Sequence, residues 1–278
     1  MRLCPETAGR KASEEAIMQF GDILVCMDGS ENGRQCTSIA LRLALHSHAR
    51  VIGYYLPAAA AGVGFPESSV PSSMDDEAVE FDRQLRLRGL EGTFVAGEKR
   101  GNIADIADHA RCVDLIVAGL GYPDGPDPDQ LNIEQLVLEC GRPVLGIPLA
   151  GASDEIGMNV MVAWDGSRES ARALHDALPF LREASAVTVA AIDEDVSSAA
   201  SAMNAIAHLK RLGIAAAIDT LPDLGMPIGD ELLSKIERNE IDLLVAGAFG
   251  HSRLREHLVG GTSRTLLHQM MVPVLVSH

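Results

Sequence analysis

The chain has 278 residues, of which 47% are apolar and 22% charged, so it can bury the core of one large or two medium domains. The net charge is −16 with no basic patch or tail, which argues against nucleic acid and anionic membrane surfaces as partners. No apolar stretch approaches the 18 residues of a spanning helix, and five cysteines without a CxxC pair favour a reducing cytoplasm.

Residues 1–20 are predicted to form an N-terminal extension, in which charges occur throughout and the apolar core of a signal peptide is missing. A first α/β domain follows over residues 21–148. Its strands are predicted at residues 23–27, 51–56, 92–95, 115–118 and 144–147. The Pro/Gly/Ser-rich run 57–73 is a candidate flexible loop before a helix over residues 75–87.

A second α/β domain is predicted over residues 158–278, after a linker. Its strands are expected at residues 160–163, 187–192, 215–220, 241–246 and 272–277. Ser167 is the expected N-cap of a helix that reaches about Leu181. Further helices are expected at residues 198–212, 228–238 and 260–270. Strands that are apolar on both faces and alternate with helices indicate a parallel sheet covered on both sides.

The two predicted domains repeat each other. Three segments of the first recur in the same order in the second, pairing Asp22–Ser30 with Asn159–Ser167, Asp114–Gly119 with Asp242–Gly247, and Pro143–Leu145 with Pro273–Leu275. A repeat of this length and order indicates a tandem duplication rather than a solenoid.

A spaced glycine motif follows the fourth strand of the second domain. Gly247 and Gly250 come directly after the apolar run 242–246, and the segment 260–263, Gly-Gly-Thr-Ser, opens the next predicted helix. Such a turn can cradle phosphate with backbone N–H groups, although it can equally be a structural turn. Asp165 stands at a strand end before Gly-Ser and is either a ligand contact or a turn-capping residue; Asp28 is its counterpart.

With these motifs in this order, the chain resembles the universal stress protein family, as two fused copies of which the second matches better. The resemblance implies two tandem five-stranded parallel sheets with helices on both faces, a Rossmann-like adenine-nucleotide-binding fold, packed as a pseudo-dimer. It also implies a role as a stress-response sensor or regulator that binds ATP, or ADP or AMP, with Mg²⁺ as a candidate companion. Carried over by position, the cofactor-binding residues are Ala163, Trp164, Asp165, Ala191, Gly247, Gly250, Gly260, Gly261, Thr262 and Ser263.

Two departures from the family pattern lie within this implied site. Gly261 intervenes before Thr262 and Ser263, where the family commonly has a hydroxyl residue directly after the third glycine. Trp164 is bulky for a position beside a base and would either stack on adenine or fill part of the pocket.

The first copy lacks the glycine motif. Tyr122 stands about where Gly250 would be, and Asp124, Asp127 and Asp129 in the same connection would repel phosphate. We therefore expect at most one nucleotide site per chain. No general base or nucleophile elbow is recognisable, so no enzyme is predicted beyond at most weak ATP hydrolysis. The alternative is a scaffold or interaction protein of the same fold that binds no nucleotide.

The terminal strands suggest how the copies associate. In the family the last strand mediates dimer contacts, and here Val144-Leu145 and Val274-Leu275 could pair within one chain. The expected state is a monomeric pseudo-dimer or a homodimer, with an unknown protein partner.

Overall fold

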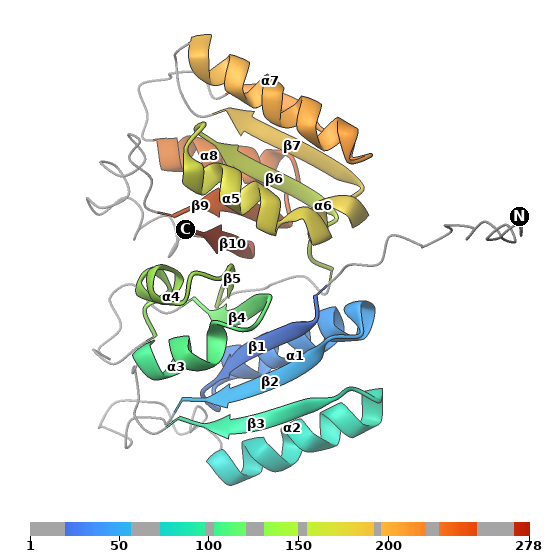
Figure 1. Cartoon of the computed structure of the whole chain (residues 1–278), viewed down its shortest axis with the longest axis vertical. Coiled ribbons are helices and arrows are strands. Elements are labelled where there is room, and N and C mark those ends of the chain that lie inside the picture. The colour runs from blue at the N-terminus through green and yellow to red at the C-terminus, as the bar shows by residue number, and fades with distance from the viewer. Residues whose placement is uncertain are drawn as a thin grey trace, which may run out of the picture.

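Figure 1 shows the computed structural model of the chain, which describes residues 20–56, 73–97, 103–120, 131–149, 155–191, 196–220, 228–248 and 270–278. The strands are β1 (Asp22–Met27), β2 (Arg50–Tyr55), β3 (Gly92–Ala96), β4 (Leu115–Gly119), β5 (Val144–Ile147), β6 (Asn159–Trp164), β7 (Ala186–Ala191), β8 (Ala217–Thr220), β9 (Leu243–Gly247) and β10 (Val274–Ser277). The helices are α1 (Glu31–Ser47), α2 (Met74–Arg88), α3 (Ile103–Ala110), α4 (Ile133–Cys140), α5 (Arg168–Asp176), α6 (Leu178–Glu183), α7 (Val196–Arg211) and α8 (Ile228–Arg238).

The strands form one sheet in the order β3-β2-β1-β4-β5-β10-β9-β6-β7-β8. Neighbouring strands are parallel within each half, and the single antiparallel pair in the described sheet joins β5 to β10, with Leu145 opposite Leu275. This confirms the α/β fold class and the pairing of the two terminal strands within one chain. The two predicted five-stranded sheets are thus joined edge to edge, and each half covers the edge strand of the other.

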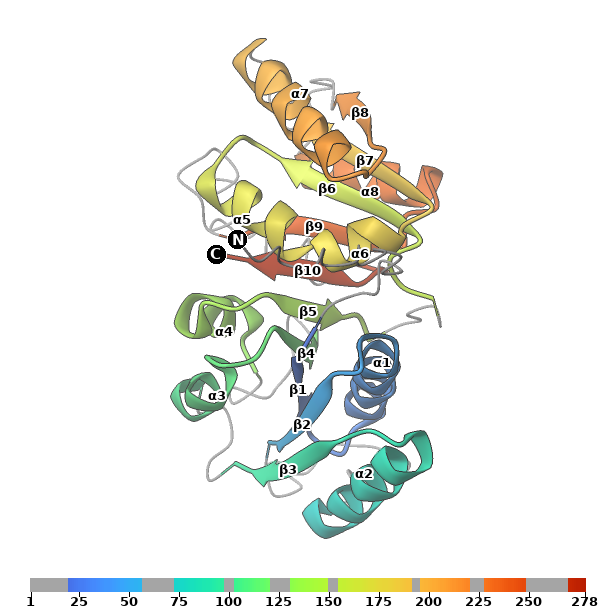
Figure 2. The same cartoon turned by 45° about the vertical axis from the view of Figure 1, so that its right-hand side comes forward.

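Helices cover both faces of the sheet, as Figure 2 shows. One buried apolar cluster contains residues of α1, α2, α5, α6 and α7, and the other contains residues of α3, α4 and α8. Along β9, Leu243 and Val245 belong to the first cluster and Leu244 to the second, which follows from the two-residue period of a strand. No described helix is long and apolar enough to cross a membrane.

The helix after β6 differs from the prediction. Ser167 is its N-cap, as expected, and the Ser167 hydroxyl accepts a hydrogen bond from the Ser170 N–H at 3.1 Å. The helix then breaks at Ala177, so that α5 ends at Asp176 and α6 begins at Leu178, with a proline in its first turn. Proline lacks the N–H that a continuous helix needs and clashes with the preceding turn, so one helix reaching Leu181 was a wrong prediction.

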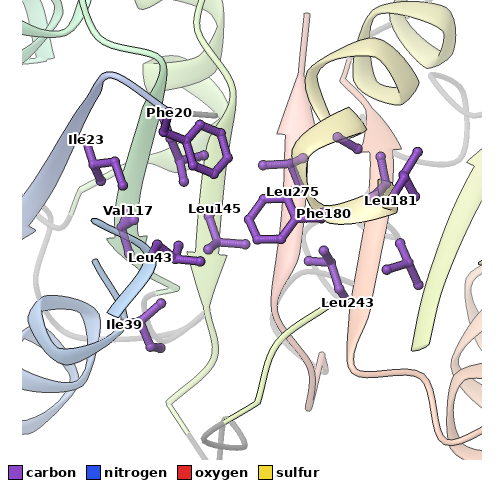
Figure 3. Close-up of a cluster of buried hydrophobic side chains, with 14 of the residues drawn as sticks. Phe20, Ile23, Ile39, Leu43, Val117, Leu145, Phe180, Leu181, Leu243 and Leu275 are labelled. Atoms are coloured by element: carbon purple, nitrogen blue, oxygen red, sulfur yellow. The ribbon is translucent and has the colours of Figure 1, made fainter. Parts of the chain in front are cut away.

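Apolar side chains from both halves meet where β5 and β10 pair (Figure 3). Leu145 and Leu275 are fully buried, and both belong to the cluster under α5 and α6. The ring of Phe20, two residues before β1, has its centroid 5.6 Å from that of Phe180 in α6. This apolar contact belongs to the same cluster as Leu145 and Leu275, so the two halves share a core.

In each half, an aspartate directly before the fourth strand accepts hydrogen bonds from the backbone at the start of the first strand. Asp242 accepts backbone hydrogen bonds from Gly157, Met158 and Asn159 at 2.9 to 3.1 Å. Asp114 does the same for Gly21 and Asp22 at 2.7 and 3.0 Å. The repeated Asp is therefore a structural residue that ties two chain segments together.

Asp242→Ala is expected to lower the free energy of unfolding by about 2 kcal/mol, because three backbone donors lose their acceptor. Burial raises the pKa of Asp242 although the backbone donors oppose this, so ionisation adds little and Asp242→Asn should cost less than Asp242→Ala. Urea denaturation measures both. Asp114→Ala, the matched change in the other half, should be comparably costly, and a loss below about 0.5 kcal/mol at either site would contradict this role.

Candidate functional site

Four predicted site residues lie at or just beyond the carboxyl ends of three adjacent parallel strands, β9, β6 and β7 (Figure 1). Trp164 ends β6 beside Ala191 at the end of β7, and Gly247 ends β9. Asp165 follows β6 directly. Ligands of open parallel sheets bind at such edges. Ala163 belongs to the cluster on the opposite face from Trp164.

Half of the predicted site residues are not among those that the structure describes. Gly250, Gly260, Gly261, Thr262 and Ser263 fall outside the described residues, as do Tyr122 and the aspartates of the corresponding connection in the first half. The phosphate-binding part of the site therefore stays a prediction.

Asp165 caps the turn into α5. Its Oδ1 accepts hydrogen bonds from the backbone N–H and the hydroxyl of Ser167, at 2.9 and 2.6 Å. Gly166 between them has a φ of 76°, which glycine adopts without strain. The same two contacts recur around Asp28 in the first half. Capping is thus a shared role of both aspartates, and ligand contact by Asp165 stays a prediction.

Trp164 is a core side chain. It is 8% exposed and belongs to the apolar cluster under α5 and α7. Its indole Nε1–H donates to the Ser201 hydroxyl of α7 at 3.1 Å. These contacts fit the expectation that the ring fills part of the pocket, which stays a prediction.

Gly247 lets α5 approach β9. A Cβ added here would lie 2.5 Å from the Ser170 backbone nitrogen and 2.8 Å from the Glu169 carbonyl oxygen, closer than any relaxed contact. At the counterpart Gly119 an added Cβ would meet the side-chain amide of Asn32 instead. Packing alone therefore requires a glycine at position 247.

Comparison with known proteins shows a family similarity in the C-terminal half. Residues 158–278 match the model of the universal stress protein family. The match covers the C-terminal half of the chain. The chain is 28% identical over 153 residues to a universal stress protein of Synechocystis sp., a match that covers 52% of this chain and about half the length of that relative.

Solved structures share the fold over nearly the whole chain. A universal stress protein from Archaeoglobus fulgidus is similar with a TM-score of 0.66 and 17% identity, over 95% of this chain and 98% of that one. A putative universal stress protein from Pseudomonas aeruginosa has a TM-score of 0.58 and 16% identity, over 95% of both chains. At these identities the likeness shows the fold alone.

In the N-terminal half of the chain, large side chains occupy the strand-end region. The Arg34 guanidinium donates to the Gly29 carbonyl at 2.9 Å and lies 4.0 Å from the Glu77 carboxylate. Glu77 and Tyr55 are both buried, with exposed fractions of 6% and 4%. The Arg34–Glu77 ion pair and the Tyr55 phenol thus occupy the region at the carboxyl ends of β1 and β2.

The C-terminal half has small residues at the same three positions. Tyr55 pairs with the last residue of β1 and corresponds to Ala191, which pairs with the last residue of β6. Counting from the equivalent helix caps, Arg34 corresponds to Ala171 and Glu77 to Ser201. Sequence reasoning missed this difference, which a residue-by-residue alignment of the two halves would have revealed.

A buried polar group that the sequence did not single out lies at the same edge. Glu169 in the first turn of α5 is 4% exposed, and its carboxylate lies 2.9 Å from the Arg168 guanidinium.

Within the described part of the chain, no three His, Cys, Asp or Glu side chains gather in a way that could hold a metal ion.

Proposed function

We propose that this chain is a universal stress protein that binds an adenine nucleotide, ATP or else ADP or AMP, in its C-terminal unit at residues 158–278, and acts as a stress-response sensor or regulator. The N-terminal unit at residues 21–148 would be a degenerate copy behind an extension of about twenty residues. The observation that carries the proposal is the asymmetry of the two halves. Ala171 and Ala191 stand in the C-terminal half where Arg34 and Tyr55 lie in the other, and the glycine motif occurs in that same half. Ser201, which accepts a hydrogen bond from the Trp164 indole, stands where Glu77 lies.

The described residues suggest how the nucleotide would be held. The backbone at the ends of β6 and β7, at Trp164 and Ala191, would face the base, since these strands end side by side. Gly247 directs the chain from β9 toward Gly250 and the segment 260–263, whose N–H and hydroxyl groups would bind phosphate. Mg²⁺, if it accompanies ATP, would be held mainly by the phosphates.

The proposal is tested by nucleotide content and by titration. We expect denaturation of purified protein to release an adenine nucleotide, identified by absorbance and mass. We also expect millimolar ATP-Mg²⁺ to raise the melting temperature and change the fluorescence of Trp164, the one tryptophan of the chain. Gly250→Asp should abolish both responses, because a carboxylate would occupy the phosphate approach. Gly121→Asp, in the corresponding connection of the first half, should preserve them.

A scaffold that binds no nucleotide is the second candidate function. Two observations favour it, since packing alone requires Gly247 and the Trp164 ring is buried against Ser201. Absence of co-purifying nucleotide, together with unchanged melting and fluorescence at millimolar ATP-Mg²⁺, would decide for the scaffold.

We place the protein in the cytoplasm. Cys26, Cys36, Cys112 and Cys140 are free thiols, which agrees with a reducing compartment. Burial raises the pKa of Cys26 to about 12, so that this thiol behaves as a small core residue.

A further inference from the structure

Glu169 places a buried carboxyl group beside the end of β9. It is the second residue of α5 after the N-cap Ser167, and Gly247 runs directly beneath its backbone. The Arg168 side chain that pairs with it is 82% exposed. The negative charge of Glu169 is therefore balanced by a cation that lies largely in solvent. A charged residue is almost never buried to this degree without a specific cause.

Ser277 supplies an independent observation at the same place. It is 1% exposed, and its hydroxyl has no hydrogen-bond partner within the described part of the chain. Ser277 is in register with Gly247 and lies on the same face of β10 as Leu275, which packs under α5 and α6. A buried hydroxyl without a partner, on the face of the sheet that α5 covers, is available to bind a ligand.

The N-terminal half has neither the carboxylate nor the hydroxyl at these positions. The counterpart of Glu169 is Asn32, which packs over Gly119 and whose Oδ1 is also buried without a hydrogen-bond partner in the described part of the chain. The counterpart of Ser277 is Ile147, which is fully buried. The packing of this helix on this strand therefore requires neither a negative charge nor a hydroxyl. Both groups occur in the half that carries the glycine motif, so a ligand explains them better than the fold does.

The Glu169 carboxylate is ionised at neutral pH. Burial by itself raises the pKa of such a carboxyl, but the backbone N–H at Glu169, the Arg168 guanidinium and His278 together leave it below its ordinary value. The carboxylate thus occupies the positive end of the α5 dipole that a ligand phosphate would otherwise use. Its charge repels the charge of a nearby phosphate.

We propose that Glu169 determines the ligand specificity of the C-terminal site by penalising phosphate charge, so that the site prefers a nucleoside monophosphate to metal-free di- and triphosphates. Ser277 donates a hydrogen bond to the ligand at the same edge. This inference rests on the proposed nucleotide binding. A divalent cation that neutralises the outer phosphates of ATP relieves the penalty, which makes ATP binding, but not AMP binding, strongly metal-dependent.

Isothermal titration of the full chain with AMP, ADP and ATP in EDTA tests this. We expect the wild-type protein to bind AMP about tenfold more tightly than ATP, and Glu169→Gln to reduce the ratio of the ATP Kd to the AMP Kd about tenfold. Glu169→Asp, which keeps the charge, should retain the wild-type ratio. Asn32→Asp, the matched change in the N-terminal half, should leave all three affinities unchanged. Ser277→Ala should weaken the three nucleotides alike.

The outcomes separate this inference from the function on which it rests. Nucleotide binding with the same ratio in the wild type and Glu169→Gln overturns the role of Glu169 and leaves the proposed function standing. Unchanged affinities in Ser277→Ala remove Ser277 from the site. If neither the wild type nor Glu169→Gln binds any of the three nucleotides, with circular dichroism showing both folded, the proposed function fails and this inference with it.

Discussion

Replacing Gly247 with alanine is expected to lower the free energy of unfolding by about 3 kcal/mol, the upper end of what overpacking costs. The added methyl group would be pressed against the backbone of α5, 2.5 Å from the Ser170 nitrogen. Backbone atoms in a capped first turn cannot move aside without breaking the cap that Ser167 provides. Urea denaturation followed by circular dichroism measures the loss.

Gly119→Ala is the matched control in the N-terminal half. Its added methyl group would meet the side-chain amide of Asn32, which can rotate away, so the expected loss is about 1 kcal/mol. Equal losses at the two glycines would contradict the packing argument. A stable Gly247→Ala variant that loses nucleotide binding would instead assign this glycine to the ligand.

Phe180→Ala is expected to destabilise the protein by about 4 kcal/mol, since the ring is fully buried and its removal leaves a cavity. The ring contacts Phe20, which precedes the first strand of the other half (Figure 3). We therefore expect the loss to weaken the coupling between the halves, so that denaturant unfolding broadens or separates into two transitions.

A double-mutant cycle distinguishes this contact from general loss of core. Phe20 and Phe180 should show a coupling energy of about 1 kcal/mol, in line with other aromatic pairs. Phe81, equally buried but in α2, serves as the control because α2 lies with β3 at the far end of the sheet. The losses in unfolding free energy of Phe81→Ala and Phe180→Ala should add. A coupling energy for Phe81 and Phe180 as large as that for Phe20 and Phe180 would contradict a specific contact between the two halves.

The strands were predictable because most are buried on both faces and each carries its signal within a few consecutive residues, the two outer strands β3 and β8 being more exposed. All five strands of each half occur within about two residues of their expected positions. The prediction of a single helix to Leu181 was wrong because the apolar pattern continues through Ala177 while Pro179 interrupts the backbone hydrogen bonds. A periodic pattern of side chains does not report on a missing backbone donor.

The candidate site was predictable only in part. The sequence placed Trp164, Asp165, Ala191 and Gly247 at strand ends, and the structure brings these ends together. Burial of the Trp164 ring against Ser201 depends on how α7 lies on the sheet, 37 residues further along the chain. No local motif records such a contact.

By itself the sequence determined the alternation of strands and helices, the duplication, and the half of the chain that carries the glycine motif, since each of these is written in consecutive residues. The tertiary structure alone decided that Gly247 is required by packing, that Arg34 and Glu77 lie together at the strand ends of the first half, and that Glu169 and Ser277 lie at one buried edge. Those properties depend on the order of strands in the sheet and on the approach of helices to it. Both arise from packing between segments far apart in the chain, which residue periodicity does not encode.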